Sequence, residues 1–316
     1  MARGTMTDPP NPAARTTEAD VADTQAIRAR ARQRRVQASM ARERVRRVTN
    51  AVMLGLTGLA TLLALIPLVW IIVDVVLLGA PSITPDFLTQ SFKPASLGGG
   101  GVLHAIVGSL ILVGLASVMS IPIGILAAFY VVRNPNTTLG LAVRFGTDVL
   151  AGLPSIVVGL FVYTLLVVGR SYSALAGAVA LAILMLPIVL RTTEEMLKLV
   201  PDSLREGALG LGAPEWKTAF SVLLPAALTG VLTGLMLAVA RVSGETAPLL
   251  FTALGSNVLS SALNRPIASL PLTLFVYATQ PDPIRHAQAW AIALIIMVIV
   301  LALNIGARLI ARHRAM

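Results

Sequence analysis

The sequence predicts an all-α, polytopic membrane protein with six transmembrane helices. Only 13% of the 316 residues are charged, whereas soluble proteins carry roughly 25%. The apolar residues also gather into long stretches, and a helix needs about 20 such residues to cross a bilayer. The stretches predicted to span the membrane are 51–78, 102–132, 147–168, 174–190, 226–254 and 287–310.

The basic residues are distributed unevenly around these stretches, and their distribution predicts the orientation. Eleven arginines lie between Arg3 and Arg47, before the first stretch. If the N-terminus is cytoplasmic, 20 of the 25 lysines and arginines fall on the cytoplasmic side. Such an excess is a topology signal in membrane proteins. Both termini are therefore predicted to be cytoplasmic.

The chain is expected to have two parts. Residues 1–50 form a basic cytoplasmic arm, partly disordered around the prolines at 9, 10 and 12, and residues 51–316 form the transmembrane domain. The first apolar stretch is too long for a cleaved signal peptide. The net charge of +10 is concentrated in the arm. Its position beside a membrane segment favours contact with anionic lipids over nucleic acid.

Several function classes find no support in the residues. There is no cysteine, and the three histidines are far apart, so neither a thiolate nor a clustered-histidine metal site is predicted. No lysine follows a glycine, which excludes the usual phosphate-binding loop for ATP. No internal repeat is evident, and inverted repeats are typical of secondary transporters. The chain is predicted not to be an enzyme and to hold no cofactor.

The longest internal loop, Arg191–Leu224, is predicted to form two short helices joined by a glycine turn. Pro201 breaks the chain, and Ser203 with Glu206 has the spacing of a capping box. The first helix is expected to end at the glycines at 210 and 212. Pro214 suits the first turn of a second helix. With the orientation above, this loop faces the cytoplasm between the fourth and fifth spans.

The same loop resembles the EAA signature of ABC importer permeases, which reads E-A-A, three residues, G, nine residues and I-x-L-P. Every spacing is met, with Gly207 in place of the first alanine and Val222 in place of isoleucine. In that family the loop docks into a groove on the ATPase subunit. The resemblance therefore implies an ATPase-coupling site, with Trp216 as an aromatic anchor. Its residues would be Glu206, Gly207, Ala208, Gly212, Trp216 and Pro225.

The fifth span contains an arginine, Arg241, about 24 Å past Pro225 at 1.5 Å per residue. An arginine at this depth is costly and is usually paired or functional. Glu245 lies four residues on and shares its helix face, while Gly244 and Pro248 predict a bend or break. A guanidinium fork matches the oxygens of an oxyanion. We predict that Glu245 holds Arg241 until an anion displaces it, with a purely structural ion pair as the alternative.

Two stretches resemble the phosphate-importer permeases of the PstA type. They are R-x-x-G-E-T-A-P-L-L-F from Arg241 and G-L-P-S-I-V-V-G from Gly152, and the wider resemblance covers about residues 51–316. It implies phosphate as substrate and a multi-pass location in the bacterial plasma membrane. It also implies a second permease, two ATPase subunits that bind ATP and Mg²⁺, and an extracytoplasmic phosphate-binding protein. The predicted translocation residues are Arg241, Glu245, Ser155 and Thr246.

Two alternatives stay open at this point. An arginine cannot distinguish phosphate from sulfate, molybdate or phosphonate by charge, so only the resemblance favours phosphate. An ion-coupled carrier without an ATPase is the second alternative, and the complete EAA spacing argues against it.

Two further features are interpreted as structural. Gly230 and Gly234 form a GxxxG pattern that favours close helix packing, with the partner permease as the expected neighbour. Asp148, near the inner end of the third stretch, is predicted to lie at the membrane interface.

Overall fold

The structure is a computed structural model that describes residues 46–47 and 49–313. The predictions for the arm fall almost entirely outside these residues. The chain divides into two units at Ile71 and Ile72. The first unit contains most of a helix, Thr49–Ser82, whose side chains up to Ile71 are exposed and largely apolar. Because this segment is apolar all round, its expected surrounding is lipid or another membrane helix.

The described chain is helical, with isolated bridges in place of strands. Within it, five helices are long and apolar enough to cross a membrane, or six if a bent pair counts as one span. The six predicted spans correspond to these elements. The long helices are Thr49–Ser82, Leu103–Arg133, Ala174–Lys198, Glu215–Ser243 and Pro283–Leu309, and the bent pair is Thr138–Gly152 with Ser155–Val167.

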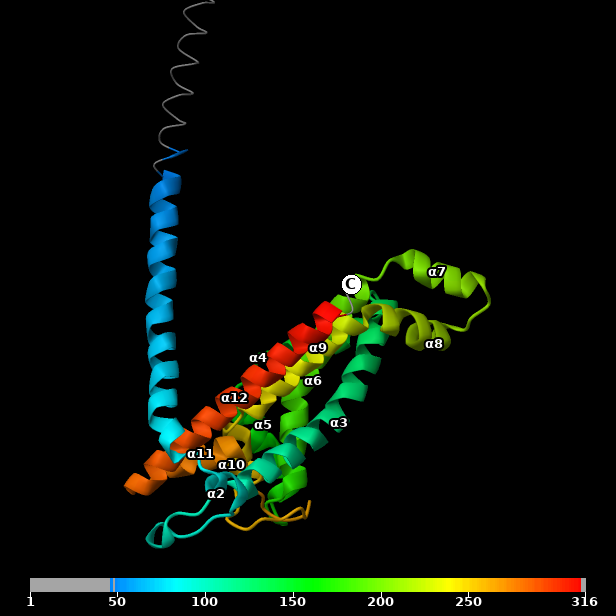
Figure 1. Cartoon of the computed structure of the whole chain (residues 1–316). Helices are drawn as coiled ribbons and strands as arrows, with labels where there is room; N and C mark the ends of the chain where they lie inside the picture. The colour runs from blue at the N-terminus through cyan, green and yellow to red at the C-terminus, as the bar shows by residue number, and fades with distance from the viewer. Residues whose placement is uncertain (1–45, 48, 314–316) are drawn as a thin grey trace, which may run out of the picture. The chain divides into compact units, whose positions relative to one another are not determined.

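The centre of the second unit is α6 (Ala174–Lys198), which packs along α3 (Leu103–Arg133) (Figure 1). About 61% of the apolar window of α6 is buried, against 22% for that of α3. The buried face of α3 carries small residues at helical spacing, and their size lets the two backbones approach closely. These residues are Ala116, Ser120, Gly124 and Ala128.

The third predicted span is broken. α4 (Thr138–Gly152) and α5 (Ser155–Val162, continued by a π turn to Val167) meet at an angle of 105°. The prediction of one straight span over 147–168 is therefore wrong, because the chain bends sharply within that stretch. Pro154 precedes α5 and lacks the backbone N–H that a continuous helix needs, so the chain turns at Leu153–Pro154.

The fifth span begins in the loop and ends earlier than expected. α8 (Glu215–Thr218) passes through a π turn (Ala219–Leu223) directly into α9 (Leu224–Ser243). A separate short helix, α10 (Ala247–Thr252), follows the break after Ser243. The predicted single span over 226–254 is therefore interrupted. A further helix, α11 (Leu270–Ala278), packs on α12 (Pro283–His313) and was not predicted.

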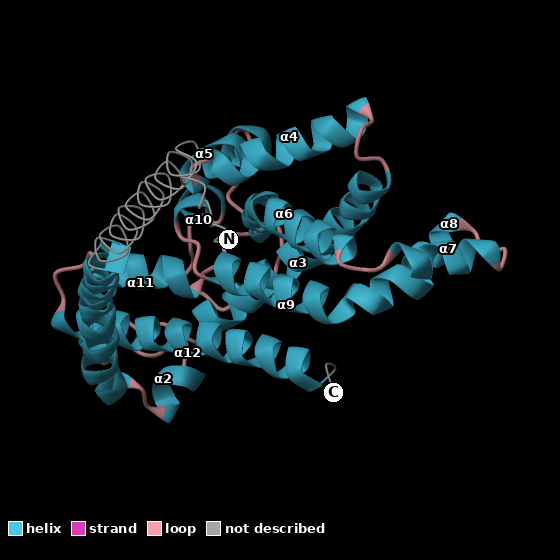
Figure 2. Cartoon of the chain, turned by 90° about the horizontal axis from the view of Figure 1, so that it is seen from above, coloured by secondary structure: helices cyan, strands magenta, loops and turns pink. Residues whose placement is uncertain are grey.

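The loop helices lie at one end of the second unit. α7 (Asp202–Gly210) and α8 project from the end of the bundle at which α3 and α6 finish (Figures 1 and 2). The opposite end carries α2 (Pro85–Thr89), the 3₁₀ turns Ala80–Ser82 and Ala95–Leu97, and the start of α12. There the buried Arg285 donates to the carbonyl oxygens of Lys93 and Gly99 and stacks on Phe92 and Tyr277.

The GxxxG pattern lies inside the chain's own bundle. A Cβ atom on Gly230 would meet the Met196 side chain at 2.1 Å, and one on Gly234 would meet the Thr192 hydroxyl oxygen at 2.6 Å. The two glycines thus let α9 approach α6 of the same chain, whereas the predicted neighbour of this face was the partner permease.

Candidate functional site

The first candidate site lies where α9 ends. Nη2 of Arg241 is 3.7 Å from Oε1 of Glu245, an ion pair too long to be a hydrogen bond. α9 ends at Ser243, and the amides of Gly244 and Glu245 donate to the carbonyls of Arg241 and Val242. The break therefore covers residues 244–246, so Arg241 lies on the last turn of α9 and Glu245 lies in the break before α10, near the predicted glycine and proline. The pair is loosely held, which suits a partner that can be exchanged.

The two charges differ in exposure. The Arg241 side chain is 69% exposed on this chain and that of Glu245 is 16% exposed. A cation on a lipid-facing surface costs about 2.5–3.5 kcal/mol on insertion scales. Residues of this kind face a bundle interior or a watery cavity. We therefore expect the exposed face of Arg241 to meet such a cavity rather than lipid.

The two stretches singled out by resemblance pack against each other. α10, which follows Glu245, lies on α5, and a Cβ on Gly159 would be 2.6 Å from Cα of Pro248. Ser155 is the first residue of α5 and Thr246 precedes α10; both are partly buried. Within the described residues, neither hydroxyl hydrogen-bonds to Arg241 or Glu245. The structure thus brings the two segments together without joining these four side chains into one polar cluster.

The second candidate site is the loop of α7 and α8. α7 has Pro201 at its N-cap, and along the described loop no side chain caps it, so the predicted Ser203–Glu206 capping box does not form. The reason is register: the helix starts at Asp202, which places Ser203 inside the first turn. Gly212 has φ of +82°, the turn that the sequence predicted, and Pro214 precedes α8.

The loop presents apolar and charged groups to solvent. Every residue of α7 is at least partly exposed, and Glu206 and Gly207 are among the exposed ones. Leu211 at the turn is 91% exposed, and Trp216 on α8 is also exposed. Uncovered large apolar side chains on a two-helix projection are typical of a protein-docking surface. Ala208 is half-buried and Pro225 lies in the first turn of α9.

Ion pairs that the sequence did not predict tie this loop to the bundle. Oε1 of Glu215, at the start of α8, accepts from Arg133 of α3 at 2.7 Å and from Arg205 of α7 at 2.8 Å. One carboxylate thus joins the end of a membrane helix to both loop helices. These pairs connect residues as far apart as 82 positions, for which no local spacing rule exists.

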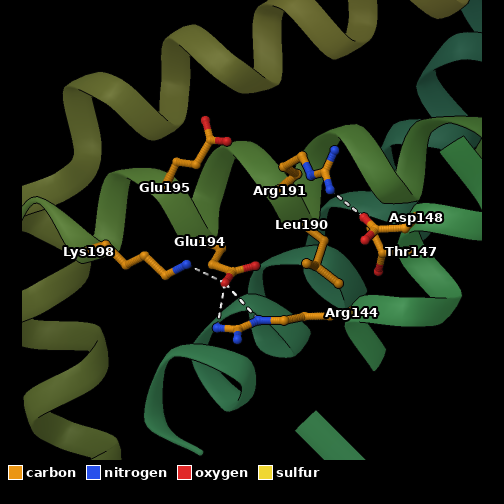
Figure 3. Close-up of a pocket in the computed structure, with 8 residues that line it drawn as sticks. All are labelled: Arg144, Thr147, Asp148, Leu190, Arg191, Glu194, Glu195 and Lys198. Carbon is orange, nitrogen blue, oxygen red and sulfur yellow. Dashed lines mark hydrogen bonds and ion pairs between the residues drawn. The ribbon is translucent and has the colours of Figure 1, made fainter. Parts of the chain in front are cut away.

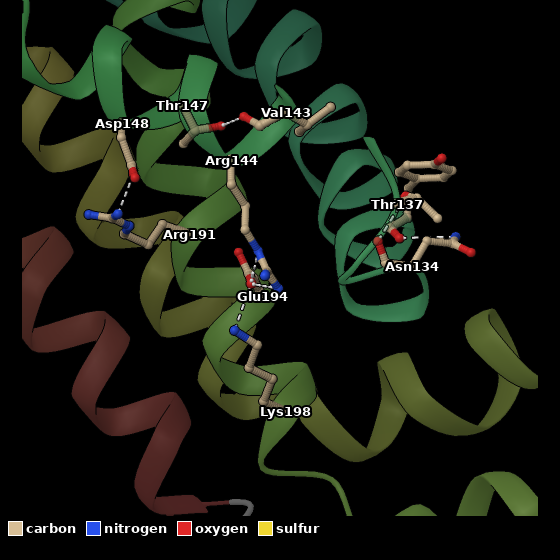
Figure 4. Close-up of polar contacts among 10 residues, drawn as sticks. Asn134, Thr137, Val143, Arg144, Thr147, Asp148, Arg191, Glu194 and Lys198 are labelled. Carbon is tan, nitrogen blue, oxygen red and sulfur yellow. Dashed lines mark hydrogen bonds and ion pairs between the residues drawn. The ribbon is translucent and has the colours of Figure 1, made fainter. Parts of the chain in front are cut away.

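A charged cavity at the same end was also missed. It holds about 360 Å³ between α4 and α6 (Figure 3). Arg191 of α6 pairs with Asp148 of α4, and Glu194 accepts from Arg144 and Lys198 (Figure 4). Asp148 is thus part of an exposed helix-to-helix pair at the bundle end. Within the described part of the chain, no group of three or more metal-binding side chains is found.

Solved structures show the class of protein to which this fold belongs. A chain of the inward-facing MetNI methionine ABC transporter matches with a TM-score of 0.58 at 18% identity, over 70% of this chain and 99% of that one. A chain of a bacterial alginate ABC transporter, solved with an alginate-bound periplasmic protein, matches with a TM-score of 0.60 at 16% identity, over 83% and 94%. The fold is therefore that of ABC transporter permeases.

Sequence comparison then gives the family. Residues 120–315 match the family described as binding-protein-dependent transport system inner membrane component, and the chain belongs to this family. Its relatives include the phosphate transport system permease protein PstA of Yersinia pestis, 45% identical over 84% of this chain and 90% of that one. PstA of Haemophilus influenzae is 44% identical over 85% of this chain and 96% of its own length. PstA 1 of Mycobacterium tuberculosis is 39% identical over 84% of this chain and 89% of its own length.

Proposed function

We propose that this chain is the permease subunit of an ATP-driven importer that carries inorganic phosphate across the bacterial inner membrane. The relatives named as phosphate permeases cover most of the chain at 39–45% identity, which supports the substrate. The observation that carries the mechanism is the Arg241–Glu245 pair at the break of α9. It places an exposed guanidinium fork in a membrane helix.

A phosphate ion that enters the membrane must lose water, and its charge needs compensation. The Arg241 fork can donate two hydrogen bonds to phosphate oxygens. Glu245, at 3.7 Å, neutralises Arg241 between transport events and yields it to the anion because the pair is long. As the phosphate leaves, the pair re-forms. The Arg241 guanidinium therefore has an anionic partner at each stage.

The coupling loop is the proposed contact to an ATPase. Leu211 and Trp216 are the exposed apolar groups that a groove on that subunit would cover. ATP and Mg²⁺ would bind to two such subunits. A second permease would complete the pathway opposite Arg241, and an extracytoplasmic binding protein would deliver phosphate. In this arrangement ATP is hydrolysed on the partners and the present chain supplies the path.

The test is phosphate uptake by the reconstituted importer carrying Arg241→Ala. Charge-assisted hydrogen bonds contribute about 1.5–3 kcal/mol each, so uptake should fall by about tenfold or more. Co-purification of the ATPase should be unchanged, because Arg241 lies about 24 Å along the helix from Pro225 at the end of the loop. Normal uptake would reduce the pair to a structural role. Competition with sulfate and molybdate tests the alternative substrates: phosphate alone should compete with labelled phosphate at low concentration.

A further inference from the structure

The cavity between α4 and α6 contains two kinds of ion pair. Arg191 and Asp148 both have 56% exposed side chains, and exposed pairs contribute little to stability. Glu194 differs because its side chain is only 10% exposed. Its Oε1 lies 2.7 Å from Nη2 of Arg144 and 2.6 Å from Nζ of Lys198. A buried carboxylate is tolerated when it is paired in this way.

The two cations paired with Glu194 come from different helices. Lys198 is on α6 itself, four residues along. Arg144 is on α4 and donates from both Nε and Nη2, at 3.0 and 2.7 Å (Figure 3). Of the two Glu194 pairs, therefore, only the one with Arg144 crosses between helices, beside the exposed Arg191–Asp148 pair that also links α6 to α4. If α4 moved away from α6, this pair would break and a buried carboxylate would lose its cross-helix partner.

The position of this pair joins the two candidate sites. Three residues separate the end of α6 at Lys198 from the start of α7 at Asp202. α4 leads through the bend at Pro154 into α5, and Gly159 of α5 lies against Pro248 of α10. α10 begins two residues after Glu245. A movement of the loop would thus reach α4 through Glu194 and then the Arg241 segment through α5.

We propose that Glu194 is a positioning residue for transport, whose ion pair with Arg144 makes α4 follow α6 when the coupling loop moves. The inference rests on the proposed function, because it concerns how ATP hydrolysis and phosphate movement stay linked. A residue in this role affects the efficiency of coupling more than assembly or hydrolysis. Contiguous packed elements of this kind are one physical route for such coupling.

The experiment measures phosphate transported per ATP hydrolysed by the complete importer in vesicles, with the binding protein present. Arg144→Gln and Lys198→Gln each remove one cation from the same Glu194 oxygen. Arg144→Gln should lower the ratio by about fivefold or more, the lower end of typical coupling, with ATPase activity retained. Lys198→Gln should leave the ratio unchanged, because its pair does not leave α6. Glu195→Gln, at an exposed neighbour on α6, is a second control.

A second variant guards against loss of folding. Glu194→Gln removes the buried charge, and Arg144→Gln combined with Glu194→Gln should be no worse than either alone, because the two residues act as one unit. Equal ratios for Arg144→Gln and Lys198→Gln would overturn the inference, as would parallel losses of uptake and ATPase activity in Arg144→Gln. If the unchanged importer carried no phosphate, the proposed function would fail and this inference with it. A fall confined to the cross-helix variants would support both.

Discussion

A lysine substitution can separate the charge of Arg241 from the planar geometry of its guanidinium group, on which its proposed role depends. Arg241→Lys keeps the cation and loses the planar fork that matches two oxyanion oxygens. We expect uptake to fall by about tenfold, the value of one charge-assisted hydrogen bond, and less than in Arg241→Ala. Labelled phosphate uptake into vesicles measures this. Equal activity of lysine and arginine would mean that charge alone is needed.

Gly159 determines how closely α5 approaches α10. A Cβ on Gly159 would lie 2.6 Å from Cα of Pro248, a backbone atom that cannot rotate away. Gly159→Ala should therefore lower stability by about 1–3 kcal/mol, as overpacking does. Thermal denaturation of the purified complex in detergent measures the effect. Gly146→Ala on α4 is the matched control, because a Cβ there meets nothing within 4 Å; an equal loss in both variants would contradict this account.

At the scale of elements, replacing either loop glycine with alanine should change the stability of the loop, in opposite directions for Gly207 and Gly212. Gly207 lies inside α7 with open space around it, so Gly207→Ala should stabilise that helix by about 0.5–1 kcal/mol. Gly212 has φ of +82°, where a side chain is strained by about 1–2 kcal/mol. Hydrogen exchange of the α7 amides should slow in the first variant and speed up in the second. The same direction in both would show that the turn does not depend on its backbone conformation.

The exposed tryptophan of the loop provides a test of docking. Trp216→Ala should weaken ATPase co-purification by about tenfold or more, because a buried aromatic anchor contributes about 2 kcal/mol or more to an interface. Val118→Ala, at an exposed apolar residue of α3, is the control. Both variants should fold, since neither side chain packs in the core. Unchanged co-purification with Trp216→Ala would place the docking contact elsewhere on the loop.

Hydropathy predicted the long helices because each contains a continuous apolar stretch of about 20 residues. It did not predict the bend at Pro154, since residues on both sides are apolar and a proline inside a span can be tolerated. α11 has nine residues, too few to span a bilayer, and so hydropathy did not predict it. The capping box does not form because the helix starts at Asp202, two residues earlier than a helix capped by Ser203 would.

Site residues were predictable where neighbours in sequence are neighbours in space. The i, i+4 spacing predicted that Arg241 and Glu245 lie close together, although Glu245 lies beyond the end of α9 and not on the predicted shared helix face. The glycine turn at Gly212 follows from residue type. Glu194 and Arg144 are 50 positions apart, and their pairing depends on how α4 returns along α6. No periodicity in one chain encodes that contact. Tertiary ion pairs were therefore the part of the site that only the structure could provide.

At the scale of the whole molecule, the orientation is a prediction that the chain itself makes easy to test. It contains no cysteine, so each introduced cysteine is a unique label site. Leu97 and Leu211 are both exposed, at opposite ends of the second unit. If the loop is cytoplasmic, a membrane-impermeant maleimide should label Leu97→Cys on spheroplasts. It should label Leu211→Cys only after permeabilisation, and the unchanged chain should stay unlabelled.

The outcome bears on the mechanism as well as on topology. Coupling to an ATPase requires α7 and α8 on the side where ATP is present, and the excess of arginine and lysine predicts that side. Labelling of Leu211→Cys on intact spheroplasts would place the loop outside and remove the physical basis for ATP-driven transport through it. If the co-expressed ATPase protected Leu211→Cys from labelling after permeabilisation, one measurement would support both the orientation and the docking surface. The exposed turn residue would then be covered by the subunit that hydrolyses ATP.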